Sequence, residues 1–392
     1  MSKILFLASW YPSRVDFLNG DFIERHAKAI ALKNDVTVIF ISKDPNLTKK
    51  KFEFTYEENG WLKVYKGYYK ESESRFKIIR KLVSQFRYFK FLHTLYNQQS
   101  VKNGKPQLVH LYVPLKAGIY ALYLRFFKQL NYVISEHHSI YMPASGLYEK
   151  KSFVTKWLIK LIFKNASAVH TVSKELGKIL TEKNLIKGNY KIIPNVVNTN
   201  IFFPSSISNT SHSNTTHHFV TITGNVYHKN TDGIFRALKK VLEKTSNFQL
   251  HVVGPYKKDL EELARTTGLI NHIHFYGALP YREVAKVNRK CDAMIFFTRY
   301  ETFGCVIIEA NACGLPVIAS DLAVIREIVT ENINGIFVNS EDEDELSKKL
   351  LWYMDHKKYF NKNEIAYFAK QNFNYEAVST QFDELYINTL KG

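Results

Sequence analysis

The sequence predicts an α/β protein built from two doubly wound domains. Two observations lead to this prediction. Short apolar runs with the length of buried strands alternate with helical patterns in both halves of the chain, and a polar, aperiodic segment, residues 191–218, separates the two series. At 392 residues, the chain is also too long for one ordinary core. We expect an N-terminal domain over residues 1–198, a C-terminal domain over residues 199–372 and a last helical segment over residues 373–392.

The strands expected in the first half are short runs of aliphatic and aromatic residues bounded by polar ones. They are residues 3–9, 35–42, 107–113, 132–138 and 166–173. Residues 21–34 follow the first run with apolar side chains at helical spacing, among them Phe22, Ala29 and Ile30. Alternation of this kind is typical of a parallel sheet covered by helices.

The second half repeats the alternation. Its expected strands are residues 219–225, 248–254, 273–277, 293–298, 315–320 and 334–339. A helix is expected to begin at about Cys305 and to end near Gly314, because Pro316 cannot continue it. Open α/β sheets bind ligands beyond the carboxyl ends of their strands, so we expect a site in a cleft between the domains.

The positive charge is concentrated in the first half. Residues 1–200 hold 33 of the 54 lysines and arginines but only 14 of the 36 acidic residues, so all of the net charge of +18 belongs there. Two segments, 75–96 and 148–166, are rich in basic and aromatic residues. This is the composition of an amphipathic helix that lies in a membrane interface. Ordinary surface helices packed on the sheet are the alternative. Nucleic acid is not expected as a partner, because no nucleic-acid-binding motif occurs.

Cysteine usage and the N-terminus point to the cytoplasm. Cys291, Cys305 and Cys313 show no metal-ligand spacing, and an odd count fits a reducing compartment. Residues 1–13 contain one short apolar run and no cleavage-site pattern, and no stretch is apolar for long enough to span a bilayer. We expect a cytoplasmic protein, peripheral at the inner face of the cytoplasmic membrane.

Two carboxylates stand out after the strand 293–298. Glu301 precedes the turn Phe303-Gly304, and Glu309 lies one turn into the following helix among small apolar residues. Unpaired N–H groups at the start of this helix suit a phosphate, and a buried carboxylate needs hydrogen-bond donors such as those of a ribose diol. A glutamate paired with a nearby lysine is the alternative for Glu309.

The segment "RYETFGCVIIEANACGLPVIAS" resembles the E-x7-E signature of the retaining GT-B glycosyltransferases of the "glycosyl transferases group 1" family, with Glu301 and Glu309 as the two acids. Five further segments are similar to family motifs in the same order, among them "IIPNVVNTNIFFP", "HVVGP" and "VISEHHS". The resemblance covers nearly the whole chain. It implies two Rossmann-like domains that face a central cleft, and a C-terminal helix that crosses back to the N-terminal domain.

The resemblance also implies site residues. Glu301, His137 and Lys229 would be catalytic: Glu301 would contact the donor sugar, His137 would reach it from the other domain, and Lys229 would neutralise the diphosphate. His138 is the alternative to His137. Glu309 would bind the ribose hydroxyls. The implied donor-binding residues as a set are Gly20, Gly224, Asn225, Gly277, Leu279, Thr302, Phe303, Gly304 and Glu309. No cofactor and no metal are expected; the acidic run 341–345 is interpreted as a solvated helix start.

The chain departs from the family pattern near Lys229. The family usually has an arginine shortly before this lysine, whereas Gly224 or Asn225 occupies the place here. We expect diphosphate binding to depend more heavily on Lys229 and on backbone groups.

These patterns together predict a retaining, metal-independent, hexosyltransferase-type glycosyltransferase. It would move a sugar from a UDP- or GDP-sugar to a lipid-linked glycan in the synthesis of capsule, exopolysaccharide or lipopolysaccharide. Its partners would be a nucleotide sugar, a glycan or lipid-linked acceptor and an anionic membrane surface. The alternatives are a glycosyltransferase with a small soluble acceptor, and a non-catalytic member that only binds nucleotide sugar or membrane.

Overall fold

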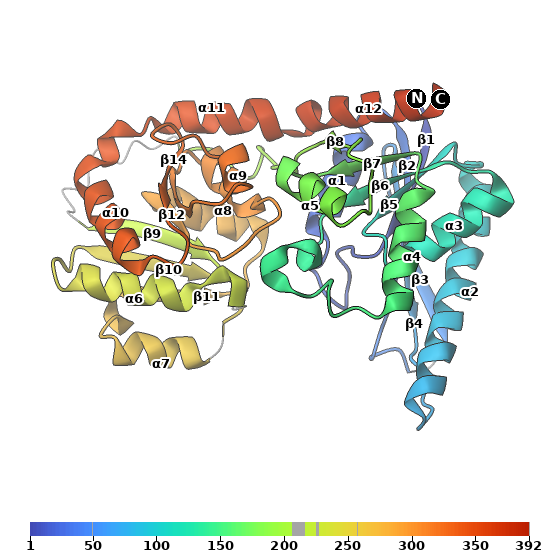
Figure 1. Cartoon of the computed structure of the whole chain (residues 1–392), viewed down its shortest axis with the longest axis horizontal. Helices are drawn as coiled ribbons and strands as arrows, with labels where there is room; N and C mark the ends of the chain where they lie inside the picture. Colours follow the sequence, from blue (N-terminus) through green and yellow to red (C-terminus); the bar gives the residue numbers. More distant parts are fainter. Residues whose placement is uncertain (49, 206–215, 225–226, 257, 392) are drawn as a thin grey trace. The chain divides into compact units, whose positions relative to one another are not determined.

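The computed structural model describes residues 1–391 apart from residues 49, 206–215, 225–226 and 257. These residues form two compact units (Figure 1). Unit 1 contains Met1–Tyr141, Gly146–Val196 and Tyr375–Gly392, and unit 2 contains Met142–Ser145 and Val197–Asn374. Each unit is an open α/β sheet with helices packed on it, which confirms the predicted fold class.

Unit 1 has an eight-stranded sheet in the order β3-β4-β2-β1-β5-β6-β7-β8. All neighbouring pairs are parallel except β3 with β4. The strands are β1 (Lys3–Ala8), β2 (Asp35–Lys43), β3 (Phe52–Asn59), β4 (Leu62–Tyr69), β5 (Leu108–Tyr112), β6 (Tyr132–Glu136), β7 (Ala168–Thr171) and β8 (Lys191–Ile192). The helices are α1 (Asp21–Ile30), α2 (Lys77–Asn103), α3 (Ala117–Lys128), α4 (Phe153–Lys164), α5 (Lys174–Glu182) and α12 (Tyr375–Lys391).

Unit 2 has a fully parallel six-stranded sheet in the order β11-β10-β9-β12-β13-β14. Its strands are β9 (His217–Ile222), β10 (Phe248–Val253), β11 (Ile273–Gly277), β12 (Ala293–Phe296), β13 (Val317–Ser320) and β14 (Gly335–Val338). Its helices are α6 (Thr231–Leu242), α7 (Lys258–Thr266), α8 (Tyr281–Lys290), α9 (Cys305–Ala312), α10 (Glu343–His356) and α11 (Lys362–Phe373). Counted along the unit, this is the strand order 3-2-1-4-5-6 of dinucleotide-binding folds.

The strands are buried because helices cover both faces of each sheet. β5 and β6 are buried at every position, which is why the sequence shows continuous apolar runs rather than alternation. The hairpin of β3 and β4 was not predicted. β3 lies at the edge of the sheet with every residue exposed or half-buried, and Phe52–Asn59 carries too many polar residues to show an apolar run.

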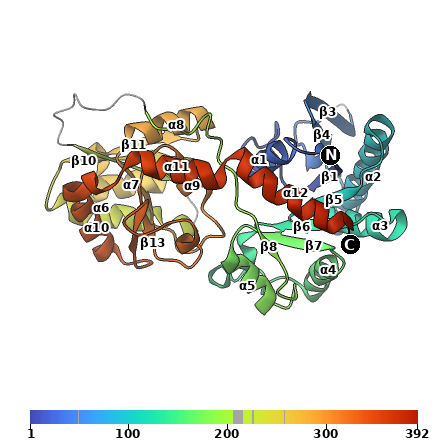
Figure 2. The same cartoon turned by 90° about the horizontal axis from the view of Figure 1, so that it is seen from above.

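The last helix, α12, belongs to the core of unit 1 although it follows unit 2 in sequence. It lies beside α1 (Figure 2). Val378, Phe382 and Tyr386 are fully buried against the strands, and the Tyr386 hydroxyl lies 2.6 Å from Nδ1 of the buried His110. Unit 1 is therefore closed by residues from both ends of the chain.

Candidate functional site

Three residues predicted for the donor site in unit 2 lie at the carboxyl ends of its strands. Lys229 follows β9, Glu301 follows β12, and Gly277 ends β11. β9 and β12 are neighbours in the sheet, and the order of strands reverses between them. In open α/β sheets a crevice forms at such a reversal, because the chain leaves the two strands toward opposite faces.

Lys229 and Glu301 form an ion pair at this point. The Lys229 ammonium donates to Oε2 of Glu301 at 2.7 Å, and the backbone N–H of Thr302 donates to Oε1 at 2.9 Å. The side chains are 21% and 13% exposed, so both charges are largely shielded from water. Burial, the largest single influence, raises the pKa of Glu301, but the attraction and hydrogen bond of Lys229, together with the Thr302 N–H and His228, outweigh it and hold the pKa below the ordinary value. The carboxylate is therefore ionised at neutral pH.

The loop that carries Lys229 is fixed by the loop that carries Glu301. The carbonyl oxygen of His228 accepts hydrogen bonds from the Thr298 hydroxyl at 2.6 Å and from the Arg299 N–H at 2.8 Å. The Arg299 guanidinium lies over the Tyr227 ring at 4.2 Å and pairs with Glu341 at 2.6 Å. Spacing in the sequence gave no signal for Arg299, because its partners lie far away along the chain.

The turn after Glu301 leads directly into α9. Thr302 and Phe303 are buried, and Gly304 adopts φ 96°, in the left-handed region that favours glycine. Glu309 lies on the second turn of α9 and is 3% exposed. A carboxylate this deep needs partners that stabilise its charge or its proton. The structure thus places the second acid of the predicted motif inside the protein rather than on its surface.

The other residues predicted for the donor site lie on separate loops. Gly277 has φ 67°, and the half-buried Leu279 follows it in the turn before α8. Gly224 is exposed after β9. Asn225 lies outside the described residues.

Two predicted site residues lie in unit 1, at the carboxyl edge of its sheet. Gly20 precedes α1 with φ 74°, and a Cβ there would lie 2.5 Å from the backbone carbonyl carbon of Trp10, so only glycine fits. His137 follows β6 and is 7% exposed; its ring packs on Phe22, and its Nε2 has no hydrogen-bond partner among the described residues. His138 is half-buried and packs edge-on against Trp10.

His137 belongs to a group of buried histidines that the sequence analysis missed. Ligand atoms of His26, His137 and His170 lie within 4.8 Å of one another. Desolvation lowers the pKa of all three, that of His170 to about 3, so the rings are neutral. The trio contains no carboxylate to balance a metal ion, and the permanent charge of Arg25 lies close to His26. Its members come from three separate elements, and no pattern in the sequence joins them.

Glu136 lies directly before His137 and carries a perturbed carboxyl group. It is fully buried, and burial raises its pKa to about 7 despite hydrogen bonds from the N–H groups of His137 and His138, each 2.8 Å long. A carboxyl group with this pKa exchanges its proton near neutral pH.

Each of the two predicted basic segments contains a helix, α2 or α4, and both helices expose apolar side chains. On α2 and just before it, Phe76, Ile78, Leu82 and Phe86 are 64–75% exposed. On α4, the exposed fractions of Phe153, Val154 and Trp157 are 83%, 69% and 55%. We call these two sets the exposed apolar residues of α2 and α4. No helix in the described part of the chain is long and apolar enough to span a bilayer.

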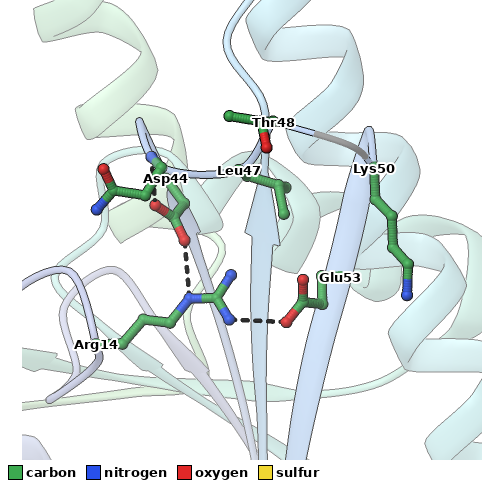
Figure 3. Close-up of a pocket in the computed structure, with 7 residues that line it drawn as sticks. Arg14, Asp44, Leu47, Thr48, Lys50 and Glu53 are labelled. Carbon is green, nitrogen blue, oxygen red and sulfur yellow. Dashed lines mark hydrogen bonds and ion pairs between the residues drawn. The ribbon is translucent and has the colours of Figure 1, made fainter.

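A cavity of about 570 Å³ in unit 1 contains none of the predicted site residues. Figure 3 shows Arg14 pointing toward Asp44 and Glu53, with which it forms ion pairs of 2.8 and 2.7 Å. The guanidinium also lies over the Tyr68 ring at 4.0 Å. Arg14 and Lys50 are the two cations of the lining, and Asp44 and Glu53 balance them in number, so this cavity carries no net positive charge for an anionic ligand.

Comparisons with known proteins cover both units. Residues 28–201 match the family model "Glycosyltransferase Family 4", and residues 206–383 match "Glycosyl transferases group 1". An uncharacterized glycosyltransferase of Methanocaldococcus jannaschii is 25% identical over 287 residues, which cover 72% of this chain and 76% of that protein.

The name of a second relative states its substrates. The GDP-mannose-dependent monoacylated alpha-(1-6)-phosphatidylinositol monomannoside mannosyltransferase of Corynebacterium glutamicum is 33% identical over 136 residues. The match spans only 32% of this chain and 35% of that protein.

The fold also occurs among solved structures. HepE of Anabaena, in complex with UDP and glucose, superposes with a TM-score of 0.71 over 99% of this chain and 100% of that one, at 17% identity. The likeness at this identity concerns the fold.

Proposed function

The chain belongs to the group 1 glycosyltransferases with the GT-B fold, and on that premise we propose that it transfers a sugar from a UDP- or GDP-sugar to a lipid-linked glycan. The family models confirm the predicted family, the group 1 glycosyltransferases. The observation that carries the proposal is the Lys229–Glu301 pair beside α9, because it joins a cation for the diphosphate and an acid for the sugar at the strand reversal of unit 2.

Lys229 has the role of stabilising the leaving group. Transfer breaks the bond between the anomeric carbon and the diphosphate oxygen, and negative charge develops on that oxygen. A preorganised ammonium group stabilises this charge in the transition state. Without a donor, Lys229 pairs with Glu301. When the donor binds, its diphosphate replaces Glu301 as the partner of Lys229, and Glu301 can then accept a hydrogen bond from a sugar hydroxyl.

The buried Glu309 has the role of binding the ribose. Its carboxylate can accept both hydroxyl protons of a diol, and such charge-assisted hydrogen bonds are stronger than neutral ones. The N–H groups around Phe303 and Gly304 bind sugar hydroxyls or phosphate in this proposal, and Thr302 positions the turn through its N–H to Glu301. Gly277 and Leu279 flank the base in this proposal, and Gly224 is among the residues that bind the donor.

We propose that the reaction retains the anomeric configuration and needs no metal. The acceptor hydroxyl attacks the anomeric carbon from the face that the diphosphate leaves, and its proton passes to the departing phosphate oxygen. Lys229 stabilises the negative charge that develops on this oxygen. In unit 1, Gly20 lets its loop approach the phosphates, and His137 or His138 contacts the donor sugar.

The acceptor is proposed to be lipid-linked because of the charge and the exposed apolar residues of unit 1. The positive excess of the first half of the chain attracts anionic lipids, and apolar side chains of α2 and α4 can enter the interface. The mannosyltransferase from Corynebacterium glutamicum acts on a phosphatidylinositol derivative, which is an example of a lipid acceptor among the relatives. A place at the inner membrane face in cell-surface polysaccharide synthesis follows from this proposal.

Donor binding tests the site. We expect the thermal midpoint of the purified protein to rise with one class of nucleotide sugar, since ligand binding stabilises the folded state by mass action. Glu309→Gln and Lys229→Met should abolish this rise. Glu331→Gln, at an exposed glutamate in the same unit, is the control and should keep it. If Lys229→Met binds the donor as tightly as the natural protein, the assigned site is wrong.

Vesicle pelleting tests the membrane proposal separately. The natural protein should pellet with vesicles that contain phosphatidylglycerol and less with pure phosphatidylcholine. The double variant Leu82→Ser with Phe86→Ser should pellet less. The control Tyr367→Ser, at an equally exposed residue of unit 2, should pellet like the natural protein. Donor binding with no vesicle binding would favour a small soluble acceptor.

A further inference from the structure

A second cavity in unit 1, of about 340 Å³, is lined by an excess of cations. Ten residues form it, of which five are basic and one, Glu71, is acidic. The basic residues are Lys43, Lys77, Arg80, Lys81 and Lys116. We call this space the basic cavity. Its volume is within the range of about 300–1,000 Å³ that is usual for small-molecule sites.

Most of these cations have no acidic partner. Glu71 pairs with Lys43, and among the described residues no carboxylate forms an ion pair with Lys77, Arg80 or Lys116. In contrast, the larger cavity in Figure 3 holds one arginine between two carboxylates. A group of unpaired cations around one cavity is electrostatically unfavourable until an anion neutralises it.

The backbone is strained where it delivers Lys116. In the loop after β5, Val113 has φ 59° and Lys116 has φ 68°, a region that non-glycine residues, and β-branched ones above all, rarely adopt. The Ser9 hydroxyl holds this loop, 2.7 Å from the carbonyl oxygens of both Val113 and Leu115. Strain of this kind concentrates at functional sites, where the surrounding structure enforces it.

Two other observations point to a ligand. Ser84, which lines the cavity and is 4% exposed, has no hydrogen-bond partner for its hydroxyl among the described residues. Lys116 is exposed, yet its pKa lies below the ordinary lysine value, first because nearby protein partly desolvates the ammonium group and second because Lys43 repels it.

The cavity lies at the functional edge of the sheet. Lys43 ends β2, Tyr69 ends β4, and Lys116 follows β5, so the cavity is at the carboxyl ends of the strands. Gly20 and His137 follow β1 and β6 at the same edge. Ligands of open α/β sheets bind there.

Helix α2 offers an apolar surface next to the cations. Lys77, Arg80 and Lys81 share one face of the helix because residues three and four apart are neighbours. Ile78 and Leu82 follow on the adjoining stripe, 75% and 64% exposed. A ligand with an anionic head and a hydrocarbon chain matches both surfaces.

We propose that the basic cavity binds the diphosphate of a lipid-linked acceptor while the hydrocarbon chain passes over the exposed apolar residues of α2. This inference rests on the proposed function, because it assigns a part of unit 1 to the acceptor of that reaction. Arg80 and Lys116 approach the diphosphate from different elements. Lys77 and Lys81 complete the neutralisation, and Ser84 offers a hydroxyl.

Calorimetric titration of the full chain with farnesyl diphosphate and with inorganic pyrophosphate tests this inference. The natural protein should bind both, and farnesyl diphosphate more tightly. Arg80→Gln and Lys116→Gln should each weaken both by at least about tenfold, the usual contribution of one charge-assisted hydrogen bond. The control is Lys90→Gln, at an exposed lysine of α2 that does not line the cavity; it should bind like the natural protein.

Vesicles of phosphatidylcholine with phosphatidylglycerol distinguish a phospholipid headgroup from the acceptor diphosphate. Arg80→Gln and Lys90→Gln should weaken vesicle binding equally, because each removes one charge from the same helix. If Arg80→Gln affects vesicles more than Lys90→Gln does and leaves farnesyl diphosphate binding intact, the cavity is a headgroup site and the inference is wrong. Equal diphosphate affinities of Arg80→Gln and Lys90→Gln would also overturn it.

The donor provides a separate readout. Stabilisation by UDP- and GDP-sugars should be the same in Arg80→Gln as in the natural protein, since Arg80 is not among the residues assigned to the donor. If the natural protein binds no nucleotide sugar but binds farnesyl diphosphate, and Arg80→Gln weakens that binding, the proposed function is refuted while the diphosphate site is not.

Discussion

Replacing Lys229 with methionine removes the cation that lies 2.7 Å from Glu301 and leaves that carboxylate without its strongest partner. At this distance the Coulomb attraction is about 6 kcal/mol for an effective dielectric constant of about 20. Desolvation of both groups offsets most of it, and with 21% and 13% of the side chains exposed the remaining coupling is about 1–2 kcal/mol. Lys229→Met and Glu301→Gln should therefore destabilise unit 2 less together than the sum of their separate effects.

Urea unfolding of the two single variants and the double variant measures this coupling. The pair Lys240–Asp344 has the same separation of 2.7 Å in the same unit, but its side chains are 39% and 72% exposed, so it serves as a matched control. Lys240→Met with Asp344→Asn should show no measurable coupling, because solvent screens the charges. A coupling at Lys229 and Glu301 no larger than that of the control would refute the assignment of a shielded pair at the proposed donor site.

Three further predictions concern unit 1. The unfolding free energy of unit 1 should fall as pH drops from about 6.5 towards 3, because His170 becomes protonated in the unfolded chain but stays neutral in the folded unit. In urea unfolding at several pH values, His170→Gln should reduce the slope of the unfolding free energy against pH by about 1.4 kcal/mol per pH unit. Gly20→Ala should destabilise the unit by more than about 1 kcal/mol, since a Cβ there meets a backbone carbon at 2.5 Å. Gly60→Ala, with φ 58° and open space around the Cβ, should cost less in the same thermal melts. Tyr386→Phe removes the hydrogen bond to His110 and should lower the unfolding free energy by about 1 kcal/mol; an unchanged midpoint would exclude a stabilising contact.

The sequence was informative wherever structure follows from local pattern. Strands such as β5 and β6 are buried throughout, so their apolar runs could be identified without knowledge of the fold. The edge strand β3 could not, because its exposed side chains are free to be polar. α2 extends to Asn103, beyond the expected end at Tyr96, since its last turns remain helical although their residues are mostly polar.

The sequence identified residues of the candidate site but not the contacts between them. Motif spacing singled out Glu301 and Glu309, while the partnership of Glu301 with Lys229 depends on β9 and β12 lying side by side. Arg299 supports the Lys229 loop through tertiary contacts and carries no local signal. The basic cavity is assembled from β2, β4, α2 and the loop after β5, so its excess of charge becomes visible only in three dimensions.

The position of α12 has a consequence for biosynthesis. Unit 1 contains residues from the beginning of the chain and also Tyr375–Gly392, so the ribosome must complete all of unit 2 before the last piece of the first core exists. Until then, the surface that will receive Phe382 and Tyr386 remains uncovered. The nascent first unit therefore lacks part of its core at this stage and exposes apolar side chains that a chaperone can bind, whereas both segments of unit 2, Met142–Ser145 and Val197–Asn374, have already been synthesised.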